Sequence, residues 1–397
     1  MKSNFFIFFL FLLTALSSLF FHAGCAKGQT QTASGSALSL SSPSVVLIES
    51  NTGKVLFEKS KDEERIPASI TKIMTLCLIF DEIEKGKLSY DDMVTVSEAA
   101  SKMGGSQVYL EPNEEQSVNT MIKCISIASA NDAAVAMAEK IAGSESAFVE
   151  RMNEKAKSLG MKHTHFINCS GLDDDITSGH YSSAYDVALM SRELLTNHPE
   201  ISKYSTVWMD EITHKTKKGE SKFGLTNTNK LVRYYKGITG LKTGSTSKAK
   251  YCLSASATRN GISLIAVIMG APDHKVRFSE AASLLDYGFA NCHLYECNYE
   301  SISFDEVTVA GGTPGKIQQY PAKKFRYVFT EPYDEGKISY KISDKSLIAP
   351  IKKGNTIGNI TFFYENNELG SVPLLAMDHC KKASYLDRLV EAFLQFV

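Results

Sequence analysis

A serine and a lysine stand three residues apart in the segment Pro67-Ala68-Ser69-Ile70-Thr71-Lys72. From Ser69 onward the apolar residues recur with a helical period, which places Lys72 on the same helical face as Ser69. A serine hydroxyl is a weak nucleophile until a base removes its proton, and a lysine can be that base when burial or a nearby cation keeps it neutral. The pair therefore predicts nucleophilic catalysis, and a helix cap at Ser69 is the alternative.

A hydroxyl and an amide stand two residues apart in Ser129-Ala130-Asn131, between two segments with a helical pattern. On such a turn both side chains can face one cleft, where Ser129 would relay a proton and Asn131 would hold a substrate carbonyl. A turn that only joins two helices is the alternative. Ser117-Val118-Asn119 has the same spacing, but Ser117 precedes a helical run and is predicted to be its N-cap.

The third element is Lys242-Thr243-Gly244, where a glycine-punctuated turn (residues 237–241) leads into an apolar strand pattern at residues 251–256. On a strand edge these residues form an anion-binding ledge, because the lysine and threonine can grip a carboxylate while the glycine lets a substrate backbone lie close. The Ser-x-x-Lys spacing recurs at Ser245…Lys248, but beside this strand rather than at a helix start.

The order of the three elements, Ser-x-x-Lys, Ser-x-Asn and Lys-Thr-Gly, is the signature of penicillin-binding proteins and class A β-lactamases. The chain more closely resembles the low-molecular-mass penicillin-binding proteins that are serine-type D-alanyl-D-alanine carboxypeptidases, over about residues 43–397. Further stretches that carry the resemblance are residues 51–58, 66–75, 129–134, 171–173, 180–186, 227–229, 240–246, 350–354 and 369–374.

The resemblance implies that Ser69 attacks the carbonyl between the last two D-alanines of a peptidoglycan stem peptide, with Lys72 as the base. Ser129 and Lys242 would return the proton to the departing D-alanine, and the backbone amides of Ser69 and Ser245 would form the oxyanion hole. The implied substrate-binding residues are Asn131, Lys242, Thr243, Gly244, Ser245 and Arg277. β-Lactams imitate the substrate and would leave the serine blocked.

Arg277, in the segment His274-Lys275-Val276-Arg277, matches an arginine that would face the terminal carboxylate of the substrate. A solvated arginine at a helix start is the alternative. The chain departs from the family where Thr239 replaces a frequent aspartate and Lys250 a frequent glycine, which puts the substrate preference in question more than the mechanism.

The resemblance also implies an α+β architecture. A catalytic domain of the β-lactamase/transpeptidase type, with an antiparallel sheet flanked by helices, would occupy residues 43–292, followed by a small all-β domain over 298–380. The sequence pattern agrees, because residues 262–269 form an unbroken apolar run that is typical of a strand covered on both faces. After Cys297, short alternating stretches separated by turn residues predict the all-β domain.

The N-terminus has the pattern of a secretory signal, with Lys2 before an apolar run over residues 5–21 and small residues after it. We predict a signal over residues 1–26 and a flexible lead-in over 27–42. A permanent membrane anchor is one alternative, although the apolar run is slightly short for a full span. Lipoprotein processing at Cys25 is another.

The C-terminal segment, residues 381–397, is predicted to be an amphipathic helix, with Leu386, Leu389 and Phe393 on its apolar face. It is too short to span a bilayer, so it would lie flat on a membrane surface, and packing on its own domain is the alternative. We therefore expect an exported protein attached to the outer face of the cytoplasmic membrane.

The composition of the 397-residue chain excludes some partners. The formal net charge of −1 gives no basic field for a nucleic acid. The eight cysteines are scattered, without the spacing of a zinc site, and are predicted to be free thiols; a Cys292–Cys297 bridge is the alternative. Cys77, Cys124 and Cys252 fall in apolar patterns that predict core positions. No metal or cofactor is expected.

Two rival functions remain open at this point. A β-lactamase needs a carboxylate-held water for fast deacylation, and the stretch around Gly171-Leu172-Asp173 offers aspartates but no glutamate-based motif. A wall- or membrane-binding protein with a silent site would have no need of Ser69, Lys72 and Lys242 together. Covalent labelling by a penicillin distinguishes the three functions.

Overall fold

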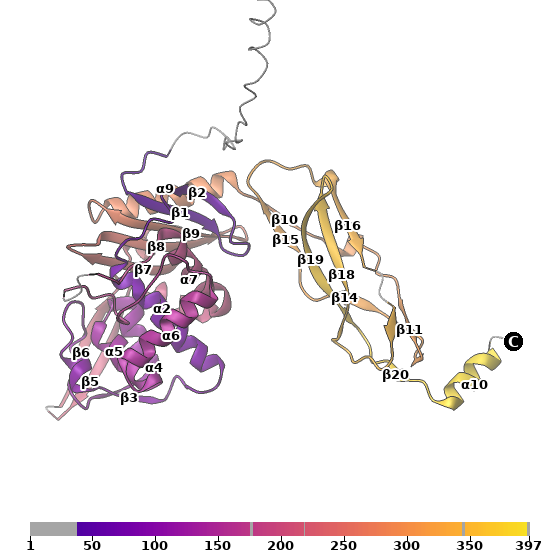
Figure 1. The fold of residues 1–397 in the computed structure, drawn as a ribbon, viewed down its shortest axis with the longest axis horizontal. Coiled ribbons are helices and arrows are strands. Elements are labelled where there is room, and N and C mark those ends of the chain that lie inside the picture. Colours follow the sequence, from indigo (N-terminus) through magenta and orange to yellow (C-terminus); the bar gives the residue numbers. More distant parts are fainter. Residues whose placement is uncertain (1–37, 175–177, 218, 344–345, 395–397) are drawn as a thin grey trace, which may run out of the picture. The chain divides into compact units, whose positions relative to one another are not determined.

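The computed structural model describes residues 38–174, 178–217, 219–343 and 346–394 (Figure 1). The predicted signal and most of the predicted lead-in lie outside these residues. At the end of the lead-in, the backbone amides of Ser41 and Ser42 donate to the Glu280 carboxylate, and Ser42 is fully buried.

A five-stranded antiparallel sheet with the strand order β2-β1-β9-β8-β7 organises the larger region, residues 40–291. Its strands are β1 (Ser44–Glu49), β2 (Val55–Lys59), β7 (Ile238–Thr246), β8 (Lys250–Arg259) and β9 (Ile262–Ala271). The apolar strand β9 is central, with helix α9 (Val276–Asn291) over one face of the sheet and α7 (Ala184–Asn197) over the other (Figure 1). The prediction of a strand covered on both faces is therefore confirmed.

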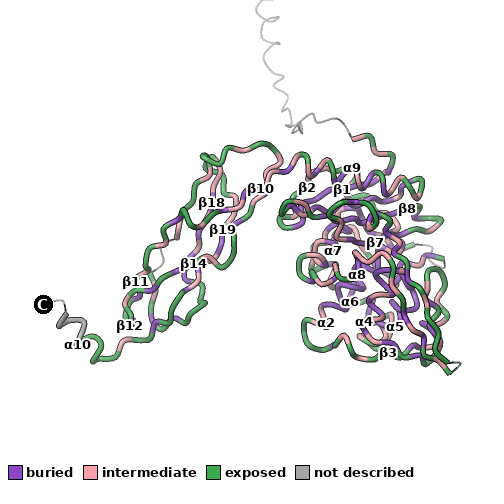
Figure 2. The backbone as a smooth tube through the Cα atoms, turned by 180° about the vertical axis from the view of Figure 1, so that it is seen from behind, coloured by how far each residue is buried: buried purple, intermediate pink, exposed green. Residues whose placement is uncertain are grey.

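Helices fill the space below the sheet and carry most of the core (Figure 2). They are η1 (Ala68–Thr71), α2 (Lys72–Glu84), α3 (Glu98–Ser101), α4 (Val118–Lys123), η2 (Cys124–Ala128), α5 (Asn131–Ala142), α6 (Glu145–Ser158), η3 (Pro199–Ile201), α8 (Ser202–Ser205) and η4 (Lys230–Arg233). Two small antiparallel pairs complete the region: β3 (Met93–Thr95) with β4 (Glu115–Ser117), and β5 (Met209–Thr216) with β6 (Gly219–Thr226). Four of the five alanines of α5 are buried, so their small side chains let neighbouring helices pack closely.

Three local features can be compared with what the sequence indicated. Ser117 is the N-cap of α4, since its side chain accepts from the Thr120 amide, and that prediction is confirmed. The turn predicted over residues 237–241 is wrong for most of its length, because β7 already begins at Ile238 and its pairing with β8 continues past Gly240 through a register shift. Lys250 adopts a left-handed conformation, φ 58°, where the related family often has glycine.

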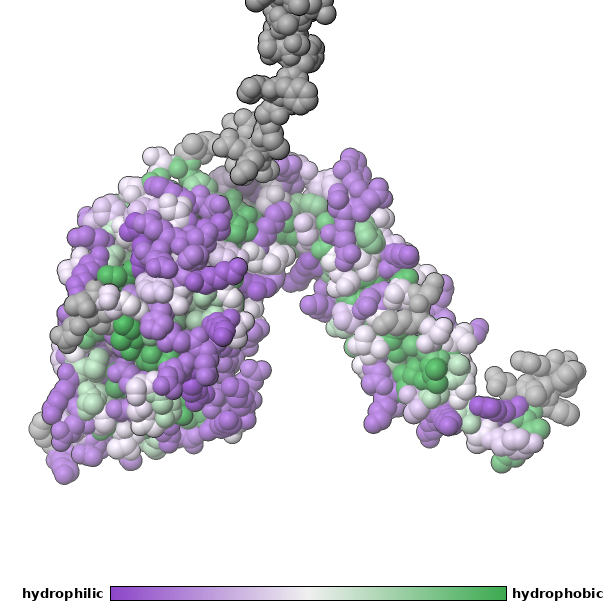
Figure 3. Space-filling view, viewed as in Figure 1, coloured by the Kyte–Doolittle hydropathy of each residue, from purple (hydrophilic) through white to green (hydrophobic). Residues whose placement is uncertain are grey.

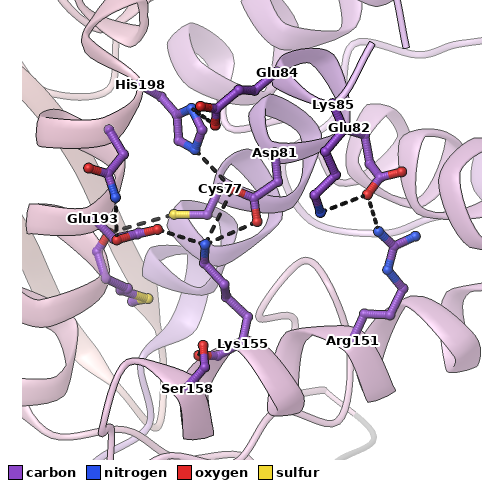
Figure 4. A network of polar contacts seen from close by, with 12 residues as sticks. Cys77, Asp81, Glu82, Glu84, Lys85, Arg151, Lys155, Ser158, Glu193 and His198 are labelled. Carbon is purple, nitrogen blue, oxygen red and sulfur yellow. Dashed lines mark hydrogen bonds and ion pairs between the residues drawn. The ribbon is translucent and has the colours of Figure 1, made fainter. Parts of the chain in front are cut away.

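An ion-pair network joins helices α2, α6 and α7 (Figure 4). The Lys155 ammonium lies 3.0 Å from the Asp81 carboxylate and 2.6 Å from that of Glu193, and His198 Nε2 lies 3.0 Å from Asp81. Asp81, Glu84 and His198 include the residue types of a metal site. The lysine already compensates the negative charge here, so we interpret the network as a helix clamp.

The C-terminal region is all-β before its last helix, as predicted. Its elements are β10 (His293–Glu296), η5 (Tyr299–Ser301), β11 (Val307–Ala310), β12 (Gly312–Thr313), β13 (Lys316–Ile317), β14 (Gln319–Pro321), β15 (Arg326–Phe329), η6 (Glu335–Lys337), β16 (Ile338–Ile342), β17 (Leu347–Ile348), β18 (Thr356–Tyr364), β19 (Asn367–Ala376), β20 (Lys381–Lys382) and α10 (Tyr385–Leu394). Its largest sheet has the order β14-β19-β18-β16, and stacked aromatic rings such as Phe325 on Phe362 fill its core.

The described cysteines are free thiols and all are buried. The predicted core positions of Cys77, Cys124 and Cys252 are confirmed, since each is fully buried. A Cys292–Cys297 bridge, the alternative from the sequence, is absent. Cys25 lies outside the described residues.

Candidate active site

The turn that carries Ser69 is held between two glycines of other segments. Ser69 lies in the 3₁₀ turn η1, directly before α2, rather than inside the α-helix itself. A Cβ at Gly171 would stand 1.8 Å from the Ala68 carbonyl oxygen, and one at Gly244 would stand 2.7 Å from the Pro67 oxygen. The loop that contains Gly171 and the strand β7 therefore pack their bare backbones against the serine turn.

Lys72 points back to Ser69, as the spacing predicts. Its Nζ lies 3.1 Å from Ser69 Oγ, 2.5 Å from Asn131 Oδ1 and 2.7 Å from the Ser170 carbonyl oxygen. The Asn131 and Ser170 oxygens can only accept hydrogen bonds, so each engages one N–H group of the amine. In the neutral amine the remaining lone pair is then free to accept the proton of the Ser69 hydroxyl.

Burial lowers the pKa of the Lys72 amine into the range that a base at neutral pH needs. Lys72 is fully buried, and desolvation lowers its pKa from 10.5 to about 7, against small opposing effects of Cys169 and Asp132. A base with such a pKa is substantially neutral at physiological pH, which is the condition for accepting a proton from Ser69.

A second lysine–serine pair faces the same site. Ser129 ends the π-helical turn η2 in a left-handed conformation, φ 64°, and Lys242 Nζ donates to its Oγ at 2.8 Å and to the Thr243 carbonyl oxygen at 3.0 Å. Desolvation, with smaller contributions from Lys72 and Arg277, holds the pKa of Lys242 well below its ordinary value. Ser129 can therefore pass a proton between a substrate nitrogen and a lysine amine.

The first residue of α5, Asn131, is fixed by the loop that precedes α4. Its side-chain amide donates to the Gly104 carbonyl oxygen at 2.7 Å, and its backbone amide donates to the Ser106 oxygen. The neighbouring Asp132 carboxylate accepts from the backbone amides of Val108 and Leu110, which holds the same loop.

The edge strand β7 presents the predicted ledge. Thr243 Oγ1 donates to Thr228 Oγ1 at 2.7 Å, and Ser245 is exposed at the end of the strand. Arg277 is not a solvated arginine, because its Nη1 donates to the carbonyl oxygens of Gly244 and Cys252 at 3.1 and 3.3 Å. Its buried Nε has no hydrogen-bond partner among the described residues, so one N–H donor of the guanidinium is unused beside the ledge.

The structure thus joins predicted residues in two hydrogen-bonded groups, Ser69–Lys72–Asn131 and Ser129–Lys242–Thr243, although the sequence separates Ser129 and Lys242 by 113 positions. A serine hydroxyl beside a buried lysine of lowered pKa, next to a strand edge that carries a second lysine, is the arrangement typical of serine hydrolases that work through an acyl-enzyme. Sequence reasoning missed the roles of the Ser170 carbonyl and of Thr228. Both residues lie in or beside stretches that carried the family resemblance, but no role was assigned to them.

Comparison with known proteins gives the family. The family model of D-alanyl-D-alanine carboxypeptidases matches residues 29–273, and that of the penicillin-binding protein 5 C-terminal domain matches residues 289–382. The chain therefore belongs to the D-alanyl-D-alanine carboxypeptidase family.

Individual relatives agree along almost the whole chain. D-alanyl-D-alanine carboxypeptidase DacF of Bacillus subtilis is 42% identical over 352 residues, covering 88% of this chain and 89% of the relative. Penicillin-binding protein 5 from Haemophilus influenzae has a TM-score of 0.68 at 30% identity, covering 88% of this chain and all of that one. Penicillin-binding protein D2 from Listeria monocytogenes, solved in an ampicillin-bound form, has a TM-score of 0.56 at 30% identity and covers 64% of this chain and 99% of that one.

These findings confirm the predicted family, the fold of the two predicted regions and the enzyme class. The roles of single residues and the domain boundaries stay predictions.

Proposed function

We propose that this protein removes the terminal D-alanine from peptidoglycan stem pentapeptides through an acyl-enzyme on Ser69. The observation that carries the proposal is the contact of a fully buried, low-pKa lysine, Lys72, with the Ser69 hydroxyl at 3.1 Å. Family membership supports the substrate, since the relatives are named for this activity.

The first half-reaction forms the ester. Neutral Lys72 accepts the Ser69 proton while the Ser69 oxygen attacks the carbonyl carbon between the two D-alanines. The resulting tetrahedral oxyanion is stabilised by the backbone amides of Ser69 and Ser245. Collapse breaks the C–N bond, and Ser129, supported by Lys242, delivers a proton to the nitrogen while the proton that Lys72 accepted passes on to Ser129. D-alanine leaves as a neutral amine, and Lys72 and Ser129 are restored.

The second half-reaction restores the enzyme. Water attacks the ester, one of its protons returns to the Ser69 oxygen, and the shortened peptide leaves as a carboxylic acid. Asn131 and Thr243 would orient the substrate backbone, and Arg277 beside the ledge would attract the terminal carboxylate of D-alanine. Two observations support these assignments: Asn131 Oδ1 contacts Lys72, and Arg277 donates to the carbonyl oxygen of Gly244, the neighbour of Thr243 that packs against the serine turn.

β-Lactams would acylate Ser69, and the resulting ester would be hydrolysed only slowly. The ampicillin-bound form of the Listeria relative supports this expectation. A β-lactamase is the less favoured function, because the relatives that match this chain are named as carboxypeptidases.

A fluorescent penicillin tests the proposal, with Ser69→Ala as the variant and Ser247→Ala, an exposed serine after the same strand, as the matched control. We expect a stable 1:1 adduct in the wild type and in the control and no adduct in Ser69→Ala. D-Alanine release from a synthetic pentapeptide should follow the same pattern. An adduct that persists in Ser69→Ala, or rapid turnover of the drug by the wild type, contradicts the proposal.

We further propose that the protein works outside the cytoplasm and is attached to a membrane surface through α10. None of the helices in the described ranges has the length and apolar character that a bilayer crossing needs. The first residues of α10 leave Leu386 and Leu389 exposed next to the polar Asp387 and Arg388, and Figure 3 shows apolar and hydrophilic atoms side by side there. An amphipathic helix of this kind is suited to the interface of a bilayer.

Vesicle flotation tests the attachment. We expect the full chain without its signal to float with anionic vesicles, and the double variant Leu386→Asp/Leu389→Asp to stay in solution. Tyr340→Asp, which alters an exposed aromatic residue on β16, is the control and should float. Equal flotation of all three proteins would exclude the helix as the attachment site.

A further inference from the structure

The loop over residues 168–173 lies against the nucleophile turn and against the end of β7. We propose that Asp173 in this loop is a positioning residue that holds the oxyanion-hole end of β7, through Thr246, at the correct distance from Ser69. The inference rests on the proposed function, because it assumes that Ser69 is acylated and that the Ser245 amide faces the oxyanion.

One end of the loop is fixed to the nucleophile helix. Thr75 Oγ1 donates to the Cys169 carbonyl oxygen at 2.6 Å, and Lys72 Nζ donates to the Ser170 oxygen at 2.7 Å. At Gly171 the backbone touches Ala68 so closely that no Cβ would fit. The loop therefore has little freedom to move relative to Ser69.

The other end of the loop is fixed to β7. Thr246 Oγ1 donates to Asp173 Oδ2 at 2.7 Å, and Lys248 Nζ donates to the Asp173 carbonyl oxygen at 2.9 Å. The Asp173 side chain is inside the protein, with a relative exposure of 3%. A hydrogen bond that is shielded from water in this way is electrostatically stronger than an exposed one.

The serine turn, the loop over residues 168–173 and β7 each contact the other two segments around Ser69. The serine turn touches the loop at Gly171 and touches β7 at Gly244, and the Asp173–Thr246 bond joins the loop to β7. Ser245 lies between Gly244 and Thr246, so two of these contacts flank the residue whose amide would bind the oxyanion. An oxyanion-hole donor is effective only within about 2.7–3.1 Å of the developing charge, so a small shift of this strand end reduces the rate.

Thr246 also contributes to the local turn, since its Oγ1 accepts from the Ala249 amide at 2.9 Å. Loss of the Asp173 partner leaves this turn bond in place. The change is thereby confined to the link between the loop and the strand, and the hairpin from β7 to β8 should remain folded.

The test uses the full enzyme without its signal and measures the second-order rate constant of acylation by a fluorescent penicillin. We expect Asp173→Ala to slow acylation by about 10- to 100-fold, somewhat less than the loss of a whole oxyanion-hole donor. Asp173→Asn keeps an acceptor oxygen for Thr246 and should stay within about threefold of the wild type. Asp174→Asn changes the exposed neighbouring carboxylate and is the matched control.

Thr246 supplies an independent set of variants. Thr246→Val removes the donor at nearly constant shape and also loses the turn bond from the Ala249 amide, so it should slow acylation at least as much as Asp173→Ala, whereas Thr246→Ser restores the hydroxyl and the rate. The double variant Asp173→Ala/Thr246→Val should be no slower than Thr246→Val alone, because that single variant already lacks the Asp173–Thr246 bond.

An infrared spectrum of the acyl-enzyme gives a readout that a purely structural role would not move. A loosened oxyanion hole polarises the ester carbonyl less, so its stretching band should shift to higher wavenumber in Asp173→Ala and Thr246→Val. Acylation within about twofold of the wild type, with an unshifted band, would overturn the inference. A wild-type enzyme that forms no adduct would instead refute the proposed function, so the two failures are distinct.

Discussion

The protonation state of Lys72 decides whether it can be the base, and a pH titration tests this directly. Its folded pKa is about 7, compared with 10.5 for an ordinary lysine, because the side chain is fully buried. About one amine in ten would be neutral at about pH 6 and about nine in ten at about pH 8, so the acylation rate should rise about tenfold between them and then level off. Stopped-flow acylation with a fluorescent penicillin measures the profile.

The same shift has a consequence for stability. Between about pH 7 and 10.5 the unfolded chain keeps a proton on Lys72 that the folded protein has released. The folded state therefore gains stability as the pH rises through this window, by about 1.4 kcal/mol per pH unit, and below the window the full penalty of burying the amine is present. Lys72→Met lacks this titration, so its stability relative to the wild type should fall by that amount per pH unit.

Urea unfolding at about pH 7, 8 and 9 compares the wild type with Lys72→Met. Lys102→Met, which alters an exposed lysine with 74% of its side chain accessible, is the control and should show the wild-type pH slope. A difference between the wild type and Lys72→Met that stays constant from pH 7 to pH 9, together with a flat acylation profile, would show that Lys72 is charged throughout. The role of Lys72 as the base would then be refuted.

Two packing predictions use urea unfolding as well. Gly171→Ala should destabilise the protein by about 3 kcal/mol or more, because its Cβ would meet the Ala68 oxygen at 1.8 Å, whereas Gly143→Ala, with a similar φ and open space, should cost only about 1 kcal/mol. Equal effects would show that the contact is unimportant. Lys155→Met should destabilise by about 3 kcal/mol, because it removes the cation that the Asp81 and Glu193 carboxylates of the helix clamp share. The exposed pair lost in Lys102→Met should change stability by less than about 0.5 kcal/mol, and a similar small effect at Lys155 would contradict the clamp.

The parts of the site that local geometry dictates could be predicted from the sequence. Ser69 and Lys72 are within one helical turn, so any helical start brings them together, and the structure places them 3.1 Å apart. The meeting of Ser129 with Lys242 is different, because they are 113 residues apart and no local rule joins them. Their pairing could be expected only through the ordered motifs and the family resemblance.

The features that the sequence did not predict depend on backbone groups and on the sheet. The carbonyl of Ser170 accepts from Lys72, but every residue has a carbonyl, so no residue type marks such an acceptor. Residues 237–241 contain two glycines and predict a turn, yet pairing with β8 keeps most of them extended. Tertiary hydrogen bonding thus overrides the local preference.

The arrangement of carboxylates explains how two lysines can share one buried site. The described side-chain hydrogen bonds of Lys72 and Lys242 go to hydroxyl, amide and carbonyl oxygens, and none goes to a carboxylate. Asp132, whose charge acts on Lys72, adjoins Asn131, but backbone amides including those of Val108 and Leu110 occupy its oxygens. A carboxylate turned toward Lys72 would raise the pKa of the amine and hold it charged. By engaging Asp132 in loop hydrogen bonds, the fold keeps Lys72 available as a base.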